Sequence, residues 1–97
     1  MSLKDIVTEN TTQNIRLMIL KALEEDPDYS HNDTVLQSIL QLVGLGVSRD
    51  KLRTELTWLS EQGLITIEDN NGVMVAKLNA RGEDVALGRS RVPGIAR

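Results

Sequence analysis

The chain has 97 residues and a net charge of −3, with 40% apolar and 26% charged residues, a balance typical of one small globular domain. The absence of cysteine excludes disulfides and thiolate metal sites, and a single histidine excludes a multi-histidine metal site. No stretch approaches the roughly 18 apolar residues of a membrane span, and no nucleophile has a base beside it. We therefore expect a cytoplasmic, non-enzymatic protein without a cofactor, a metal or a membrane partner.

The first segment predicts a short helix and then a longer one. Ser2 is followed three residues later by an aspartate, which is a helix-start signal. The polar residues 10–12 favour caps and predict a break, or a second helix start, before a main helix over residues 12–25. Leu17 and Leu20 lie on the side of that helix opposite to its main apolar face. Either a terminal segment covers these two leucines, or they form a homodimer interface.

Two more helices are expected on either side of a glycine-containing turn. The first spans residues 32–43 and ends at the turn 44–46. The second spans residues 48–62, with Ser48 as its cap. Gly63 is placed to end that helix in a left-handed conformation.

The pair Asn71-Gly72 predicts a β-hairpin, because both central residues of its tight turn need a positive φ. With this loop, Ile67 pairs with Ala76 and Ile65 pairs with Leu78. The apolar residues of both strands then share one face, as a half-buried hairpin requires. The register therefore supports the hairpin independently of the turn signal.

A short helix is expected after the hairpin, over residues 80–87. The chain then holds a Pro-Gly pair and several arginines, which favour an extended or disordered end. We therefore expect one domain over residues 1–88 and a flexible basic tail over residues 89–97, whose arginines are Arg89, Arg91 and Arg97.

Residues 47–65 resemble the recognition helix and first wing strand of winged-helix regulators. Those families place leucines seven and four residues before Gly-Leu-Ile or Gly-Leu-Val, which Leu56, Leu59 and residues 63–65 match. Residues 78–85 are similar to the segment that follows the wing. The resemblance implies a mostly α fold with a β-hairpin wing, that is, a winged helix-turn-helix. Its parts are three core helices, a two-stranded wing and a short C-terminal helix.

The whole chain also resembles a family of small proteins encoded in Mu-like prophages, sometimes labelled ArsR-like. The shared features are Ser48-Arg49-Asp50, Trp58-Leu59 and residues 88–94. This second resemblance implies a phage or prophage origin and little about chemistry. Trp58 lies beside the leucine stripe of its helix. We expect it to be half-buried, either against the hairpin or first helix or on a partner surface.

The winged-helix resemblance implies a phage transcriptional regulator whose helix 48–62 enters the major groove of double-stranded DNA. Arg49 and Arg53 are four residues apart and share a side of that helix, so either can reach a guanine or a phosphate. A two-fold homodimer would place two such helices about one DNA turn apart. The candidate DNA-binding residues are Arg49, Lys51, Arg53, Thr54, Thr57 and Lys77.

Three features favour an alternative, a winged-helix protein-interaction module with a protein partner and no DNA. Asp50 and Glu61 share the exposed face of the third helix, where they repel phosphates. The hairpin tip 69–72 is acidic, and Lys77 is the hairpin's one cation. The overall charge is also acidic, whereas duplex binding rests on Lys and Arg. If DNA is bound, the tail arginines replace the wing.

Overall fold

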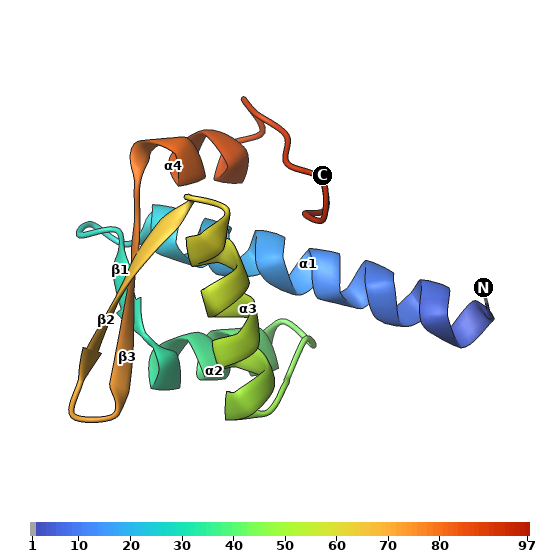
Figure 1. Ribbon diagram of the computed structural model, residues 1–97, viewed down its shortest axis with the longest axis horizontal. Coiled ribbons are helices and arrows are strands. Elements are labelled where there is room, and N and C mark those ends of the chain that lie inside the picture. The colour runs from blue at the N-terminus through green and yellow to red at the C-terminus, as the bar shows by residue number, and fades with distance from the viewer. Residues whose placement is uncertain (1) are drawn as a thin grey trace.

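Four helices and three strands make up residues 2–97, which the computed structural model describes (Figure 1). Their order is consistent with a winged-helix-like layout. In chain order the elements are α1 (Leu3–Glu25), β1 (Ser30–Asn32), α2 (Asp33–Leu42), α3 (Arg49–Glu61), β2 (Ile65–Asn70), β3 (Val73–Leu78) and α4 (Ala80–Ala86).

The three strands form one antiparallel sheet in the order β1-β3-β2. The register of β2 and β3 is confirmed, with Ile67 opposite Ala76. Asn71 and Gly72 both have a positive φ, as the predicted two-residue turn requires. The hairpin buries its apolar face against the helices and leaves the other face to solvent.

The sequence does not predict β1, so the expected two-stranded wing is part of a three-stranded sheet. His31 of β1 lies opposite Ala76 of β3. Next to this pair, the Leu78 N–H donates to the Tyr29 carbonyl at 2.8 Å. A strand of three residues is too short to show a period of two. Its pairing therefore comes from tertiary structure and not from a local pattern.

Helix α1 is one uninterrupted helix of 23 residues, so the predicted break at residues 10–12 is wrong. A capping box at Ser2 starts the helix, as the sequence indicates. Inside it, the Thr11 hydroxyl donates to the Val7 carbonyl at 2.9 Å. The polar side chain therefore bonds within the helix instead of ending it. Residues 3–11 are exposed, and Figure 1 shows this part of α1 projecting away from the other elements.

The hydrophobic core fills the space between α1, α2, α3 and the inner face of the sheet. Leu20 belongs to it and has no exposed surface, so it cannot form the predicted dimer interface. Leu17 is half-buried beside the C-terminal segment. The C-terminal segment thus lies beside Leu17, as the other explanation expects, whereas Leu20 is buried in the core itself. The largest fully buried apolar side chains are Ile15, Ile19, Leu20, Leu23, Leu36, Leu40, Leu52, Leu56, Leu59 and Leu64.

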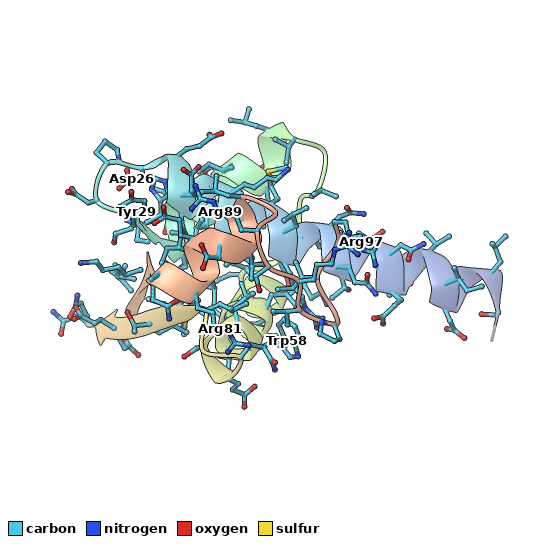
Figure 2. All side chains as sticks on the ribbon, turned by 90° about the horizontal axis from the view of Figure 1, so that it is seen from above. Asp26, Tyr29, Trp58, Arg81, Arg89 and Arg97 are labelled. Atoms are coloured by element: carbon cyan, nitrogen blue, oxygen red, sulfur yellow. The ribbon has the colours of Figure 1, made fainter. Side chains whose placement is uncertain are left out.

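Residues 89–97 pack on the body of the molecule, which differs from the flexible tail expected from the sequence. Val92 and Ile95 are each 8% exposed and join the core. The Ala96 N–H donates to the Gln13 carbonyl of α1 at 3.2 Å. Seen from above, the segment carries Arg97 to the side of α1 (Figure 2). Apolar side chains and hydrogen bonds therefore hold a segment whose composition is typical of a linker.

Candidate nucleic-acid interface

The start of α3 contacts α2 and the hairpin turn, and it lies at the end of the molecule opposite to α4 (Figure 1). Three leucines of α3 point into the core, and its N-cap is the Ser48 hydroxyl, which accepts from the Lys51 N–H. This amphipathic pattern leaves one face of the helix in solvent. We call it the α3 face, and its exposed residues are Arg49, Asp50, Thr54, Thr57 and Glu61.

Among the residues that define the α3 face, Arg49 is the one cation, and its side chain is exposed to solvent. Its guanidinium donates to the Thr34 hydroxyl of α2 at 3.1 Å. Within residues 2–97 it has no carboxylate within ion-pair distance. Because Arg49 starts α3, its long side chain can reach a partner beyond the helix end.

Arg53 is committed to contacts within the protein. Its guanidinium lies 2.8 Å from the carboxylate of Asp33, which is 1% exposed at the start of α2. It also donates to the Gly72 carbonyl in the hairpin turn. Arg53 thus joins α2, α3 and the hairpin, and its charge is balanced, although 32% of its side chain remains exposed.

Lys51 is also paired, because it neutralises a buried glutamate. Its ammonium lies 2.7 Å from Glu55, whose side chain is 2% exposed. Arg16 of α1 contacts the other oxygen of Glu55, also at 2.7 Å. Burial alone raises the pKa of Glu55. The hydrogen bonds and charges of Lys51 and Arg16 outweigh that effect, so its pKa lies below the ordinary value.

The sequence reasoning missed Glu55, although a signal is present. Glu55 follows Leu52 by three residues and precedes Leu59 by four, which places it on the buried side of α3. A carboxylate on an apolar stripe predicts a buried charge that needs cations. The partner from α1 could not be read in the same way, because pairing between separate helices depends on how they pack.

Arg16 extends this cluster to Trp58 and the C-terminal segment. Its guanidinium stacks 3.7 Å from the centre of the Trp58 ring and donates to the Gly94 carbonyl at 2.9 Å. Trp58 is half-buried, as expected. Figure 2 shows its position relative to the C-terminal segment. Arg16 therefore links α1, α3 and the tail.

The remaining candidate residues divide between two surfaces. Thr54 and Thr57 are exposed on the α3 face, and the Thr54 hydroxyl donates to the Asp50 carbonyl at 3.0 Å. Lys77 is exposed on the outer face of the sheet, because its neighbours along β3 point toward the core. The structure thus brings the threonines to Arg49 and leaves Lys77 on another surface.

Two kinds of site are absent from the described part of the chain. Residues 2–97 contain no group of three or more His, Asp or Glu side chains placed to hold a metal ion. Over the same range, no helix combines the length and the apolar character needed to cross a membrane.

Two proteins from phage and bacterial sources are similar to this chain, whereas no family model matches it. The chain is 43% identical over 95 residues to gp26 of Escherichia phage Mu, described as uncharacterized, and the match covers 98% of this chain and 94% of gp26. It is also 43% identical over 82 residues to an uncharacterized protein of Haemophilus influenzae, covering 84% of this chain and 76% of that protein. With this identity along nearly the whole of both chains, the protein belongs to the family of phage Mu gp26.

Proposed function

We propose that this protein is a winged-helix protein that binds double-stranded DNA through the α3 face and acts as a phage transcriptional regulator. The observation that carries the proposal is the exposed start of α3, where an unpaired Arg49 shares the surface with Thr54 and Thr57. A helix of this kind fits the major groove, which is about 12 Å wide. The flanking α2 and hairpin give the helix a fixed orientation.

Three of the predicted contact residues support the proposal because they are exposed on the α3 face. In this proposal Arg49 reads a guanine or binds a phosphate, and Thr54 and Thr57 supply hydroxyls beside it. Lys51 and Arg53 support the helix instead, because each balances a buried carboxylate. With so few free cations, we expect weak non-specific affinity and a salt slope of only about −1 to −3.

For the homodimer, the exposed large apolar side chains of α1 lie on its projecting N-terminal part. Leu3, Ile6 and Val7 are 77%, 43% and 55% exposed and share one side of the helix. An exposed apolar patch of this kind is typical of an interaction surface. The occupant that we infer is a second copy, because two-fold operators require paired recognition helices.

The experiment is binding of a labelled duplex, measured by fluorescence anisotropy at about 50 mM and about 200 mM salt. We expect Arg49→Ala to weaken binding by about fivefold or more. Arg89→Ala removes the same charge from the tail, and it should leave binding unchanged because Arg89 is paired with Asp84 of α4, away from the start of α3, and so does not replace the wing. Arg53→Ala is unsuitable as a test, since it leaves the buried carboxylate of Asp33 unpaired. An equal loss of duplex affinity in Arg49→Ala and Arg89→Ala, or no binding by the wild type at low salt, would refute this proposal.

One observation favours a second candidate, a protein-interaction module on the same scaffold. Lys51 and Arg53 are neutralised within the chain, and Asp69 lies at the hairpin tip, where its carboxylate accepts from the Gly72 N–H at 3.0 Å. Of the residues that define the α3 face, Arg49 is cationic and Asp50 and Glu61 are anionic, so the face has no net positive charge. If the protein binds no duplex, the protein-interaction function is favoured instead.

A further inference from the structure

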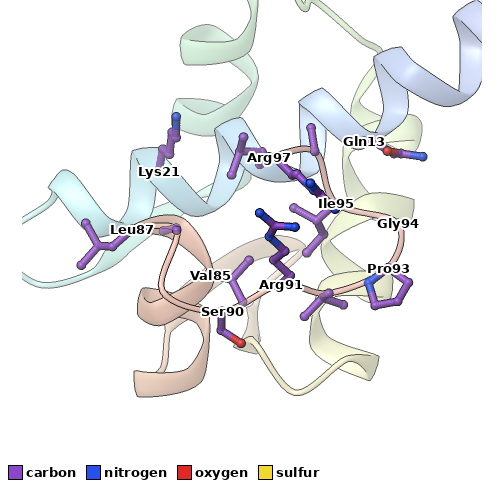
Figure 3. Close-up of a pocket in the computed structure, with 15 residues that line it drawn as sticks. Gln13, Lys21, Val85, Leu87, Ser90, Arg91, Pro93, Gly94, Ile95 and Arg97 are labelled. Atoms are coloured by element: carbon purple, nitrogen blue, oxygen red, sulfur yellow. The ribbon is translucent and has the colours of Figure 1, made fainter.

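A groove separate from the α3 face lies between α1 and the C-terminal segment (Figure 3). Its volume is about 660 Å³, within the range of roughly 300–1,000 Å³ that small-molecule sites occupy. Leu17 of α1, Val85 of α4 and the tail residues Val92 and Ile95 give it apolar walls. The groove is therefore large enough to hold the apolar part of a small molecule.

The charged residues that line the groove are all cationic. They are Lys21, Arg91 and Arg97, and the lining contains no aspartate or glutamate. Figure 3 shows the guanidinium groups of Arg91 and Arg97 turned into the space between the tail and α1. Within residues 2–97, none of the three cations forms an ion pair, in contrast to Arg16, Lys51, Arg53 and Arg89.

The tail that forms one wall of the groove is held in place. Arg16 binds the Gly94 carbonyl at 2.9 Å, and the Ala96 N–H is bonded to α1 at 3.2 Å. The N–H groups of Arg89 and Ser90 both donate to the Asp84 carbonyl, at 2.8 and 3.2 Å. Arg91 and Arg97 both lie on this wall and carry like charges, which a bound anion would balance.

We propose that this groove binds a small molecule that has a phosphate group attached to an apolar body. Arg91 and Arg97 would bind the phosphate oxygens, because a guanidinium matches phosphate with paired hydrogen bonds. Lys21, at the edge of the groove, adds a third positive charge. The apolar side chains beneath them bury the rest of the ligand. A phosphate is favoured over a carboxylate because its second negative charge is also balanced here.

The test is a titration of the full chain with phenyl phosphate, followed by amide chemical shifts in NMR. We expect saturable shifts that map to residues 85–97 and the facing part of α1, with tighter binding than either inorganic phosphate or phenol. Arg91→Gln and Arg97→Gln should each weaken binding by about tenfold, the scale of one lost charge-assisted hydrogen bond. Both arginines are exposed, so these variants retain the fold.

The matched control is Arg89→Gln, which removes a neighbouring tail cation that does not line the groove and is paired with Asp84 at 3.6 Å. It should leave the affinity unchanged. An equal loss in this control, the absence of saturation, or equal binding of inorganic phosphate would overturn the proposal. The inference does not rest on DNA binding, since Arg49→Ala should not alter the phenyl phosphate titration.

Discussion

At the scale of single residues, the buried carboxylates determine which cations remain free. Glu55 holds Lys51 and Arg16, and Asp33 holds Arg53. A buried carboxylate left without its cation is costly, so these pairs fix side chains that would otherwise point into solvent. Arg49 has no such partner within residues 2–97, which makes it the most informative residue for function.

The first prediction concerns the charge of Glu55. Glu55→Gln keeps the size of the side chain but leaves Arg16 and Lys51 without a counter-charge. Because Arg16 is largely buried and Lys51 is 39% exposed, we expect the free energy of unfolding to fall by about 1–3 kcal/mol. Urea denaturation measures this loss. The control Glu61→Gln alters an exposed carboxylate of the same helix and should change stability little; equal losses would contradict the assignment.

The pH dependence of stability follows from the same residue. The pKa of folded Glu55 lies below its ordinary value of 4.5, so the unfolded chain binds the proton more readily. Its contribution is therefore complete above that value and is lost as the pH falls through the lower pKa of the folded state. We expect the stability difference between the wild type and Glu55→Gln to shrink between about pH 6 and about pH 3. A difference that stays constant over this range would rule out the ion cluster as its source.

At the scale of elements, the C-terminal segment is bound through one close contact with α3. Gly94 has a φ of +96°, and a Cβ built there comes within 2.9 Å of the Trp58 ring. Glycine is therefore needed for its backbone conformation and also for the space beside the ring. This contact connects the tail to the Glu55 cluster, because Arg16 lies on the same ring.

Substitution of this glycine should release the tail. We expect Gly94→Ala to lower the free energy of unfolding by about 1–2 kcal/mol. The emission of Trp58, the chain's single tryptophan, should shift to longer wavelength as its ring gains contact with water. Gly88→Ala is the matched control, since Gly88 has a φ of +77° with nothing within 4 Å of its Cβ position. An emission shift of the same size in the control would argue against the Trp58 contact.

The projecting part of α1 allows a test of self-association. Replacing Leu3, Ile6 and Val7 together by Gln should abolish the dimer in sedimentation velocity and leave the unfolding of the isolated subunit nearly unchanged, because these side chains are exposed. The paired change Lys4→Gln and Thr8→Gln, on another side of the same segment, should not affect association. A wild type that sediments as a monomer at high concentration would refute the dimer.

At the scale of the whole molecule, local patterns predicted the helices α2 and α3, the hairpin and its register. They did so because amphipathic periodicity and the Asn71-Gly72 turn act over short distances. The missed features depend on tertiary contacts, which no short window contains. They are the pairing of β1, the continuity of α1, the buried tail and the ion pairs of the candidate site.

The candidate site could be predicted only in part for the same reason. Arg49, Thr54 and Thr57 are exposed because of their position on an amphipathic helix, and that position is visible in the sequence. Whether Lys51 and Arg53 are free depends on Glu55 and Asp33, which become buried only when the helices pack. The groove beside the tail could not be anticipated at all, since its wall was expected to be mobile.

The most direct test of the DNA-binding account is an NMR titration of the labelled protein with a duplex of about two helical turns. We predict that the largest amide shifts fall on residues 48–57 and on the start of α2, and that Arg49→Ala reduces them. Shifts confined to the projecting part of α1 or to residues 89–97, or no shifts at low salt, would contradict the claim that the α3 face binds DNA.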